Sequence, residues 1–512
     1  MKKFICILAV AGLCLTGCGK QDVPVQEAAV YEGTAIVLSD SAVTVDGQPV
    51  SQDSSQAVYT ANDIIYYEEG HDFTYGEGTE TDAHSQAEAD AHTVVHITQP
   101  GTYILQGSLS KGQVAVDLGE NAKEDPSAVV TLVLDGVDIT SSVAPGVIFY
   151  NVYECGTTDD PTNTVDTAAA GANVVLADGS QNRVNGSYVA RIYKPDSVVL
   201  SQDGTEVEDA KKLHKYDAAF YSKMSMNVGG SGALDIIAEN EGLDSELHLT
   251  VNGGDIRIRS GNDGINTNED GVSVTTINGG SLDILVTGQT GEGDGIDSNG
   301  WLVINGGSVT AQACATSGDA GIDSDMGIHI NGGTVIATGN MLDRISESQQ
   351  TYGVFQFAQP QKAGVYTLKN EQGEGVAQMD VTNAFSYLVV SAETLGAGEY
   401  TLWQGENQLK GMTSGAMGSG MPGGGQMPKD KVPPEGMEMP ENMIPPEGME
   451  RPEGMEIPEG TMPENMTPPE GMEMPQRPEG GRGQFGGFGG EMGEASDVFF
   501  FAEGGNYFMV MG

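Results

Sequence analysis

The sequence is poor in aromatic and basic residues, and each shortage excludes a class of protein. Aromatic residues make up 6% of the 512 residues, whereas glycine contributes 73. This balance favours short strands and tight turns over a helical core. Only 23 lysines and arginines stand against 73 aspartates and glutamates, which gives a net charge of -50. So large an excess of negative charge repels phosphate backbones and anionic lipids, so we expect no nucleic-acid partner.

Long hydrophobic runs are also missing after the first residues, where the chain begins with a signal peptide. Lys2 and Lys3 precede the apolar stretch 4–15, which is too short for a permanent transmembrane helix. The stretch ends in Leu-Thr-Gly-Cys, which is similar to the bacterial lipobox, so cleavage is expected to leave Cys18 as an acylated N-terminus. An ordinary signal peptide is the alternative. We expect an extracytoplasmic cell-surface lipoprotein whose contact with the membrane is made through the lipid anchor alone.

Cysteine is scarce in the folded body of the protein. Of five cysteines, Cys6 and Cys14 leave with the signal peptide and Cys18 is the predicted lipid carrier. Cys155 and Cys314 remain. They either pair in an oxidising compartment or stay as two buried thiols, and their spacing does not decide between these states.

The most informative feature that is present is an internal repeat. Asn-Gly-Gly begins at residues 252, 278, 305 and 331, which gives periods of 26, 27 and 26 residues. A second phrase recurs between these units as Glu-Gly-Leu-Asp at 241–244, Asp-Gly-Ile-Asn at 263–266, Asp-Gly-Ile-Asp at 294–297 and Ala-Gly-Ile-Asp at 320–323. Two phrases in one register indicate a repeat architecture.

Apolar residues alternate within each unit, which is typical of strands. A unit of about 26 residues cannot bury its apolar face alone, but it can when successive coils stack and each strand pairs with its equivalent in the next coil. The sequence therefore predicts an all-β protein built on a parallel β-helix. Two inward stacks are expected, one of Ile265, Ile296 and Ile322, and one of Ile277, Ile304 and Ile330.

The composition divides the chain into six segments. We expect a signal peptide with lipobox at 1–18, a tether and N-terminal cap at 19–95, the parallel β-helix at 96–345, a C-terminal β-rich cap at 346–410, a flexible low-complexity loop rich in Pro-Glu-Gly-Met at 411–493, and a terminal β segment at 494–512. Two polar stretches, 155–172 and 196–215, are expected to project from the coils as loops.

Three further phrases carry a resemblance to a known family. Residues 97–107 read Ile-Thr-Gln-Pro-Gly-Thr-Tyr-Ile-Leu-Gln-Gly, residues 132–137 read Leu-Val-Leu-Asp-Gly-Val, and residues 176–182 read Leu-Ala-Asp-Gly-Ser-Gln-Asn. With the repeats, they resemble the bacterial secreted carbohydrate-binding β-helix proteins over about residues 30–410. The resemblance implies a right-handed parallel β-helix similar to a polysaccharide lyase, bound calcium, and attachment to cellulose or acidic plant polysaccharide without known cleavage. Ala320, which replaces the first acid of its phrase, and the methionine-rich insertion depart from the pattern.

The recurring acids predict a cation site. Stacking places the last residues of the phrases, Asp244, Asn266, Asp297 and Asp323, in one row, and Asp263 and Asp294 lie three residues before members of that row. Like charges opposed on neighbouring strands are destabilising, and a divalent cation relieves the repulsion. An all-oxygen donor set suits Ca²⁺. The alternative is that these residues only serve the turns, for which Asp and Asn are well suited.

A bound cation would also allow an acidic protein to meet an acidic glycan such as polygalacturonate, by bridging the two sets of carboxylates. A neutral glycan such as cellulose would instead use an aromatic platform, for which Trp301 is the candidate. The regular coils carry only Arg257 and Arg259 as basic residues, with Arg257 expected to pair with Asp283. We therefore predict a non-catalytic carbohydrate-binding protein; a structural or adhesive surface protein and a polysaccharide lyase or hydrolase are the alternatives.

Overall fold

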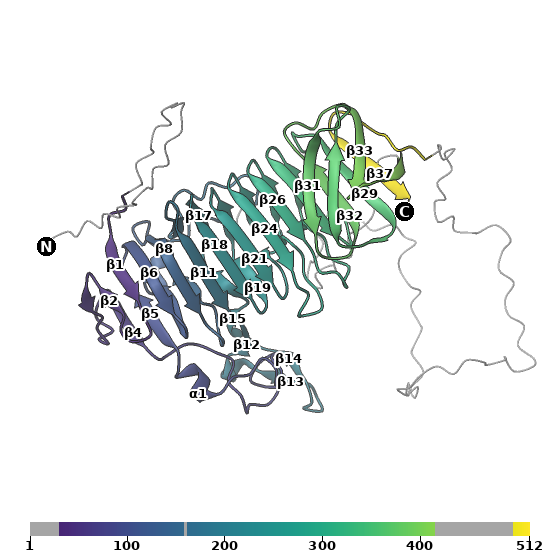
Figure 1. The fold of residues 1–512 in the computed structure, drawn as a ribbon. Helices are drawn as coiled ribbons and strands as arrows, with labels where there is room; N and C mark the ends of the chain where they lie inside the picture. The colour runs from purple at the N-terminus through teal and green to yellow at the C-terminus, as the bar shows by residue number, and fades with distance from the viewer. Residues whose placement is uncertain (1–29, 158–160, 415–494, 512) are drawn as a thin grey trace, which may run out of the picture. The chain divides into compact units, whose positions relative to one another are not determined.

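The computed structural model describes residues 30–157, 161–414 and 495–511, which belong to one compact unit (Figure 1). The prediction of an all-β protein is confirmed: within these ranges the helices are α1 (Gln86–Ala89) and the 3-10 turns η1 (Glu120–Glu124) and η2 (Pro195–Ser197). None of them is long and apolar enough to cross a membrane. The predicted signal peptide, Cys18 and most of the low-complexity segment 411–493 lie outside the described residues.

Most strands belong to three parallel ladders. The first and second ladders both start from β8 (Val130–Thr140), which pairs in parallel with β6 (Gly101–Leu109). The first ladder continues through β10 (Ala172–Leu176), β17 (Met226–Gly230), β20 (His248–Val251), β23 (Val274–Ile277), β25 (Trp301–Ile304) and β27 (Gly327–Ile330). The second continues through β11 (Gln181–Gly186), β18 (Ala233–Ala238), β21 (Asp255–Ser260), β24 (Ser281–Val286), β26 (Ser308–Gln312) and β28 (Thr334–Gly339).

The third ladder is shorter. It consists of β5 (Thr93–Ile97), β7 (Gly112–Asp117), β9 (Val147–Asn151), β16 (Ala218–Ser222), β19 (Glu241–Ser245) and β22 (Ile265–Thr267). Each turn of the chain thus adds one strand to each ladder in this region, and Figure 1 shows the strands side by side.

The register of the ladders follows the sequence period. Val274 pairs with Trp301, and Trp301 pairs with Gly327, which are steps of one repeat. In the same register Ile277, Ile304 and Ile330 are neighbours and are fully buried. The other predicted stack, Ile265, Ile296 and Ile322, is also buried. Both predicted stacks are therefore confirmed as core, and each fully buried isoleucine contributes about 1.5–3 kcal/mol of hydrophobic stabilisation.

The N-terminal strands lie at the start of the ladders. β1 (Thr34–Leu38) pairs in parallel with β6, and β2 (Thr44–Val45) and β3 (Gln48–Pro49) extend it as antiparallel strands. β4 (Val58–Ala61) pairs antiparallel with β5. The stretch 196–215, expected to project from the coils as a loop, contains the antiparallel pair β13 (Val199–Leu200) and β14 (Val207–Asp209). It also contains most of β15 (Lys212–Tyr216), which pairs antiparallel with the preceding strand β12 (Val189–Tyr193).

The parallel order changes after β28, which pairs antiparallel with β32 (Phe385–Ser391). The strands that follow form mainly antiparallel pairings around a second, aromatic-rich core. They are β29 (Tyr352–Gln361), β30 (Gly364–Lys369), β31 (Gly375–Val381), β33 (Gly398–Gln404), β34 (Asn407–Gln408), β35 (Lys410–Thr413), β36 (Phe499–Phe501) and β37 (Gly505–Met511). β37 pairs with β29 and β35, and β36 pairs with β33. Cys155 and Cys314 are both free thiols.

Candidate functional site

The predicted row of oxygen donors is brought together on successive turns. Asp244 of β19 pairs directly with Asn266 of β22. The next two turns continue the row by backbone hydrogen bonds: Asp297 N–H donates to the Ile265 carbonyl at 2.8 Å, and Asp323 N–H donates to the Ile296 carbonyl at 2.7 Å. The stacking of the repeat therefore places these four side chains beside one another, although their role as cation ligands stays a prediction.

The acids three residues before the row bind the backbone of the next turn. Asp263 Oδ1 accepts from Asp294 N–H at 2.6 Å, and Asp294 Oδ1 accepts from Ala320 N–H at 2.5 Å. Ala320, where the repeat lacks its acid, is thus the donor to the carboxylate of the preceding turn. Asp319 beside it accepts from Gly293 N–H at 2.6 Å.

Three acids form what we call the outer carboxylate cluster: Asp294, Asp297 and Asp323. One carboxylate oxygen from each lies within 4.8 Å of the other two, and the side chains are partly buried. Burial, reinforced by the neighbouring carboxylates, raises the pKa of Asp294 to about 10, of Asp323 to about 8 and of Asp297 to about 7. Asp323 Oδ1 is buried and has no hydrogen-bond partner among the described residues.

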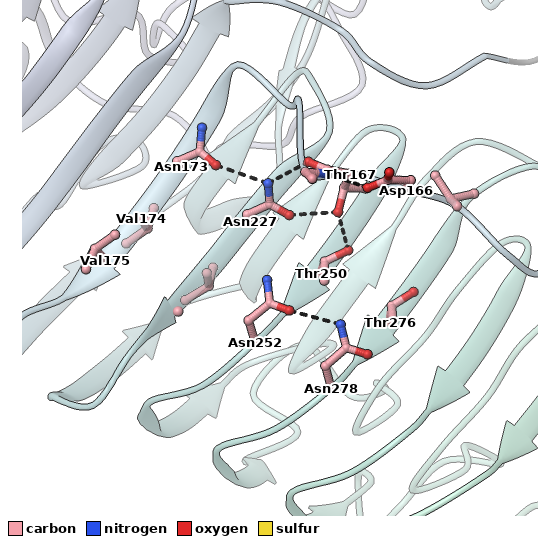
Figure 2. Close-up of a pocket in the computed structure, with 14 residues that line it drawn as sticks. Asp166, Thr167, Asn173, Val174, Val175, Asn227, Thr250, Asn252, Thr276 and Asn278 are labelled. Carbon is pink, nitrogen blue, oxygen red and sulfur yellow. Dashed lines mark hydrogen bonds between the residues drawn. The ribbon is translucent and has the colours of Figure 1, made fainter.

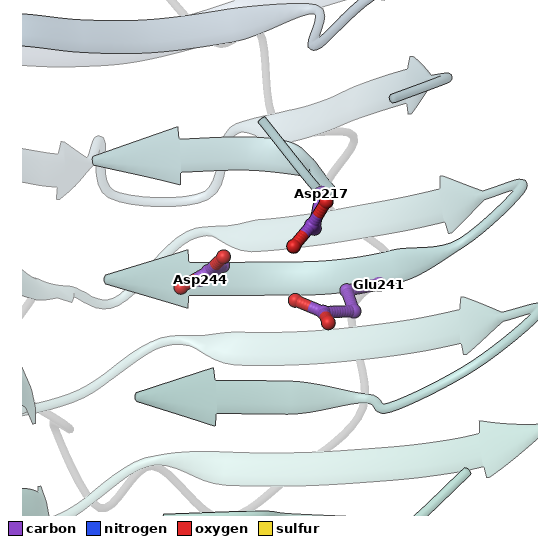
Figure 3. Close-up of side chains that lie close together, drawn as sticks. All are labelled: Asp217, Glu241 and Asp244. Atoms are coloured by element: carbon purple, nitrogen blue, oxygen red, sulfur yellow. The ribbon is translucent and has the colours of Figure 1, made fainter. Parts of the chain in front are cut away.

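A second group, the inner carboxylate cluster, consists of Asp217, Glu241 and Asp244 (Figure 3). Glu241 and Asp244 lie on β19, and Asp217 directly precedes β16. All three side chains are buried. Burial raises the pKa of Glu241 and of Asp244 well above the ordinary range, and neighbouring carboxylates add to both shifts.

The inner cluster is only partly satisfied by protein groups. Lys215 Nζ lies 2.5 Å from Asp217 Oδ2, and Asn268 Nδ2 donates to both oxygens of Asp244 at 2.9 and 3.0 Å. Asn266 Nδ2 donates to Glu241 Oε1 at 3.2 Å. Glu241 Oε2 and Asn266 Oδ1 are buried without a partner among the described residues, which is costly unless another group binds them.

Two members of the inner cluster were missed by the sequence analysis. Glu241 is the first acid of its phrase and occupies the position of Asp263 and Asp294, so the repeat alone would have allowed its prediction. Asp217 carries no such signal. It directly precedes β16, one residue before the pairing partner of Glu241, and lies outside the four recognised phrases.

Both clusters fit a hard divalent cation. Their donors are carboxylate and amide oxygens, and neither cluster contains histidine or cysteine among the described residues. This is the donor chemistry that Ca²⁺ prefers and Zn²⁺ does not. The unpartnered oxygens of Asp323, Glu241 and Asn266 are consistent with the same chemistry.

The raised pKa values predict how stability depends on pH when divalent cations are removed. Folded Asp294 and Asp323 bind protons at pH values where unfolded aspartate, with a pKa of about 3.9, does not. The folded state therefore holds more protons than the unfolded state, and the free energy of unfolding falls as pH rises. In chelator, we expect the melting temperature to decrease between pH 7 and pH 8.5, measured by circular dichroism. A constant or rising melting temperature would contradict these shifts.

The remaining predicted side chains lie on the first and second ladders. Trp301 is partly exposed at the start of β25, between Val274 and Gly327 of the adjacent strands. Its role as a sugar-stacking residue stays a prediction. The predicted ion pair between Arg257 and Asp283 is wrong, because Arg259 Nη2 makes this contact at 2.8 Å and Arg257 pairs with Asp255 at 3.3 Å.

Comparisons with known proteins place this chain among carbohydrate-binding proteins. A family model described as "Carbohydrate-binding domain-containing protein" matches residues 91–369. A curated protein of the same description from Acetivibrio thermocellus is 26% identical over 167 residues, which are 32% of this chain and 45% of that protein. The chain thus aligns with less than half of this relative's length. A solved structure described as the polysaccharide lyase-like protein from C. thermocellum, gadolinium derivative, aligns with a TM-score of 0.35 and 19% identity, over 62% of this chain and 93% of that one.

Proposed function

The chain belongs to the carbohydrate-binding domain-containing protein family, and we propose that it is a non-catalytic cell-surface protein that binds acidic polysaccharide in a calcium-dependent manner. The observation that carries the calcium part is the outer carboxylate cluster. Its three carboxylates converge within 4.8 Å, and one of its buried oxygens has no partner among the described residues. Such a group of like charges is stable when a cation or protons compensate it.

The three parallel ladders support a finer description of the fold. We infer that they are the three faces of a right-handed parallel β-helix, because successive turns add one strand each to the first and second ladders at the period of the sequence repeat, and to the third ladder as far as β22. In this arrangement the acids of the outer cluster lie on two successive turns, Asp294 and Asp297 on one and Asp323 on the next, so a polymer lying along the stacking direction can meet carboxylates of both turns.

Acidic glycan is the ligand that the charges favour once calcium is present. Asp294, Asp297 and Asp323 would hold the ion with carboxylate oxygens, and they are accessible enough to share it with an outside ligand because none of them is fully buried. When bound, calcium would supply positive charge and free coordination positions for uronate carboxylates. Without it, a chain of net charge -50 repels such a polymer.

The inner cluster supports a structural role instead. Asp217, Glu241 and Asp244 are buried too deeply to meet a polysaccharide, so a cation there would stabilise the folded coils. A purely structural or adhesive surface protein remains the second candidate function on this observation. We further propose that acylated Cys18 anchors the protein to the outside of the cell membrane.

Retention on polysaccharide tests the proposal. Residues 19–512 should be retained on immobilised polygalacturonate in calcium and released by chelator, because the bridging charge is removed. Cellulose serves as the neutral comparison, and the eluate is assayed for unsaturated and reducing-end products. If the chelator does not change the retention, binding does not depend on calcium and the bridging proposal is wrong. Product release would replace the binding function with that of a lyase or hydrolase.

A further inference from the structure

A row of asparagine amides follows the first ladder. Each Asn-Gly-Gly unit begins directly after a strand of that ladder, and its asparagine side chain lies at the surface or is partly exposed. The side chains bind one another in series: Asn278 Nδ2 donates to Asn252 Oδ1 at 2.9 Å, Asn305 Nδ2 to Asn278 Oδ1 at 3.0 Å, and Asn331 Nδ2 to Asn305 Oδ1 at 3.0 Å. We call Asn252, Asn278, Asn305 and Asn331 the amide row.

The amide row keeps hydrogen-bonding capacity for an outside ligand. A primary amide has two N–H donors and an oxygen with two lone pairs. The series uses one donor and one lone pair of Asn278 and of Asn305, and these exposed side chains retain one of each. The mutual hydrogen bonds also fix the side-chain rotamers, so little conformational entropy remains to be lost when a ligand binds.

The row begins in a groove of about 390 Å³ (Figure 2). Asn252 and Asn278 line it together with outward side chains of the first ladder, Asn173, Asn227, Thr250 and Thr276. The segment 165–168 forms one wall. Thr167 holds this wall in place, because its hydroxyl lies 2.7 Å from Asn227 Oδ1 and 2.6 Å from Thr250 Oγ1.

The chemistry of the groove selects a neutral, hydroxyl-rich ligand. Among the described residues that line it, amides and hydroxyls predominate, lysine and arginine are absent, and Asp166 is the one carboxylate. A uronate would therefore find no counter-charge and would be repelled. Sugar hydroxyls both donate and accept hydrogen bonds, as the amides do.

The spacing of the row favours an extended polymer. Neighbouring strands of a sheet lie about 4.8 Å apart, so successive amides repeat at about that distance. The rise per sugar of an extended β-1,4-linked glucan is close to this spacing. Consecutive sugars can therefore meet consecutive amides in equivalent positions.

We propose that the groove and the amide row bind an extended segment of neutral β-linked glycan without calcium. This rests on the proposed function only in taking carbohydrate as the ligand, because the site is separate from both carboxylate clusters. It provides the protein with a neutral-glycan site that uses no aromatic platform.

Cello-oligosaccharides of two to six sugars are the probes, titrated calorimetrically into the full chain in chelator. Affinity should rise with each added sugar until the four amides are covered and then level off. The double variant Asn278→Ala/Asn305→Ala should lower the affinity for the six-sugar probe by at least about tenfold, since each lost hydrogen bond costs about 1 kcal/mol. Retention on polygalacturonate in calcium should be unchanged.

A second variant separates binding from coil stability. Gly229 lies on the groove floor, and a Cβ there would meet only Asn252 Cβ at 3.6 Å, so Gly229→Val fits the strand and fills the groove. Gly375→Val is the matched control, since its Cβ would meet Thr367 Cγ2 at 3.5 Å outside the groove. Gly229→Val should lower the affinity for the six-sugar probe about tenfold, and Gly375→Val should leave it unchanged.

Three outcomes would overturn the proposal: wild-type protein that binds no oligosaccharide, an affinity that does not depend on probe length, or full affinity in Gly229→Val. Loss of polygalacturonate retention with intact oligosaccharide binding would instead sink the calcium-dependent function alone. If Asn278→Ala/Asn305→Ala fails to fold, Gly229→Val decides.

Discussion

Asp297→Asn/Asp323→Asn should abolish calcium binding at the outer cluster and, in chelator, give a protein more stable than the wild type. The two substitutions keep side-chain size and remove two of three carboxylates whose oxygens lie within 4.8 Å of one another. At pH 9, above the pKa values of Asp297 (about 7) and Asp323 (about 8), these two side chains are ionised, and two full charges at that distance repel by about 3 kcal/mol at an effective dielectric constant of about 20. The carboxylates without a bound cation destabilise the folded state. Replacing two of them with neutral amides should therefore raise the free energy of unfolding.

In calcium the order of stabilities should reverse. A cation that binds only the folded protein raises the free energy of unfolding by about 2.7 kcal/mol when its free concentration is a hundred times the Kd. The double variant has lost two charged ligands, so we expect its affinity for calcium at this cluster to fall by on the order of 100-fold or more. Chemical denaturation in calcium and in chelator measures both effects, and polygalacturonate retention should be lost in parallel.

The matched control removes two carboxylates from the second ladder. Asp255 and Asp283 each pair with a partly exposed arginine, and such surface pairs contribute about 0–1 kcal/mol. Asp255→Asn/Asp283→Asn should therefore leave the calcium dependence unchanged. A wild-type calcium response in Asp297→Asn/Asp323→Asn would assign the cation to another site, the inner cluster first.

The sequence repeat made the outer cluster predictable. The repeat does not extend upstream to Asp217, so the inner cluster could not be predicted in full. A fixed period with two phrases in register determines which residues become neighbours, so the row from Asp244 to Asp323 follows from the sequence alone. Asp217 lies upstream, after the antiparallel inserts β12 to β15, where no phrase recurs. Only the folded structure shows that its carboxylate lies beside Glu241 and Asp244.

The wrong ion pair has a similar cause. The register places Arg257 opposite Asp283, as the sequence analysis expected. Arginine, however, is long enough to reach across two residues, and the Arg259 guanidinium also donates to the carbonyls of Ile258 and Asp283 at 2.8 and 3.0 Å. These backbone acceptors decide the partner, and backbone acceptors cannot be assigned from side-chain spacing.

Gly264→Ala should strongly destabilise the coils. Gly264 is the second residue of its Asp-Gly-Ile-Asn phrase, and a Cβ there would lie 2.2 Å from Ile284 Cγ2 and 2.5 Å from the carbonyl oxygen of Gly295. One contact is with the side chain packed against it and the other with the backbone of the next turn. The second cannot be relieved by a rotamer change, so the turns must separate.

We expect Gly264→Ala to lower the free energy of unfolding by at least about 3 kcal/mol, the upper part of the range for overpacked cores. Gly375→Ala is the control, because its Cβ would make an ordinary contact of 3.5 Å with Thr367 Cγ2. Both are measured by urea denaturation in chelator, so that calcium does not mask the difference. A wild-type stability for Gly264→Ala would show that the turns are not packed as closely as these distances require.

The same substitution should weaken calcium binding without changing any ligand. Gly264 N–H donates to the Asp294 carbonyl at 3.0 Å, and Ile265 N–H donates to the Gly295 carbonyl at 3.2 Å, so this contact between turns positions the outer cluster. Turns forced apart at Gly264 shift the turn that carries both Asp294 and Asp297, which displaces these carboxylates relative to Asp323 on the following turn, and a carboxylate site tolerates such displacement poorly. Calcium titration of whatever fraction of Gly264→Ala folds should therefore give a Kd at least about tenfold higher, whereas Gly375→Ala should bind as the wild type does. Equal affinities would mean that the phrase glycine serves the packing of the coils and has no part in holding the cation site.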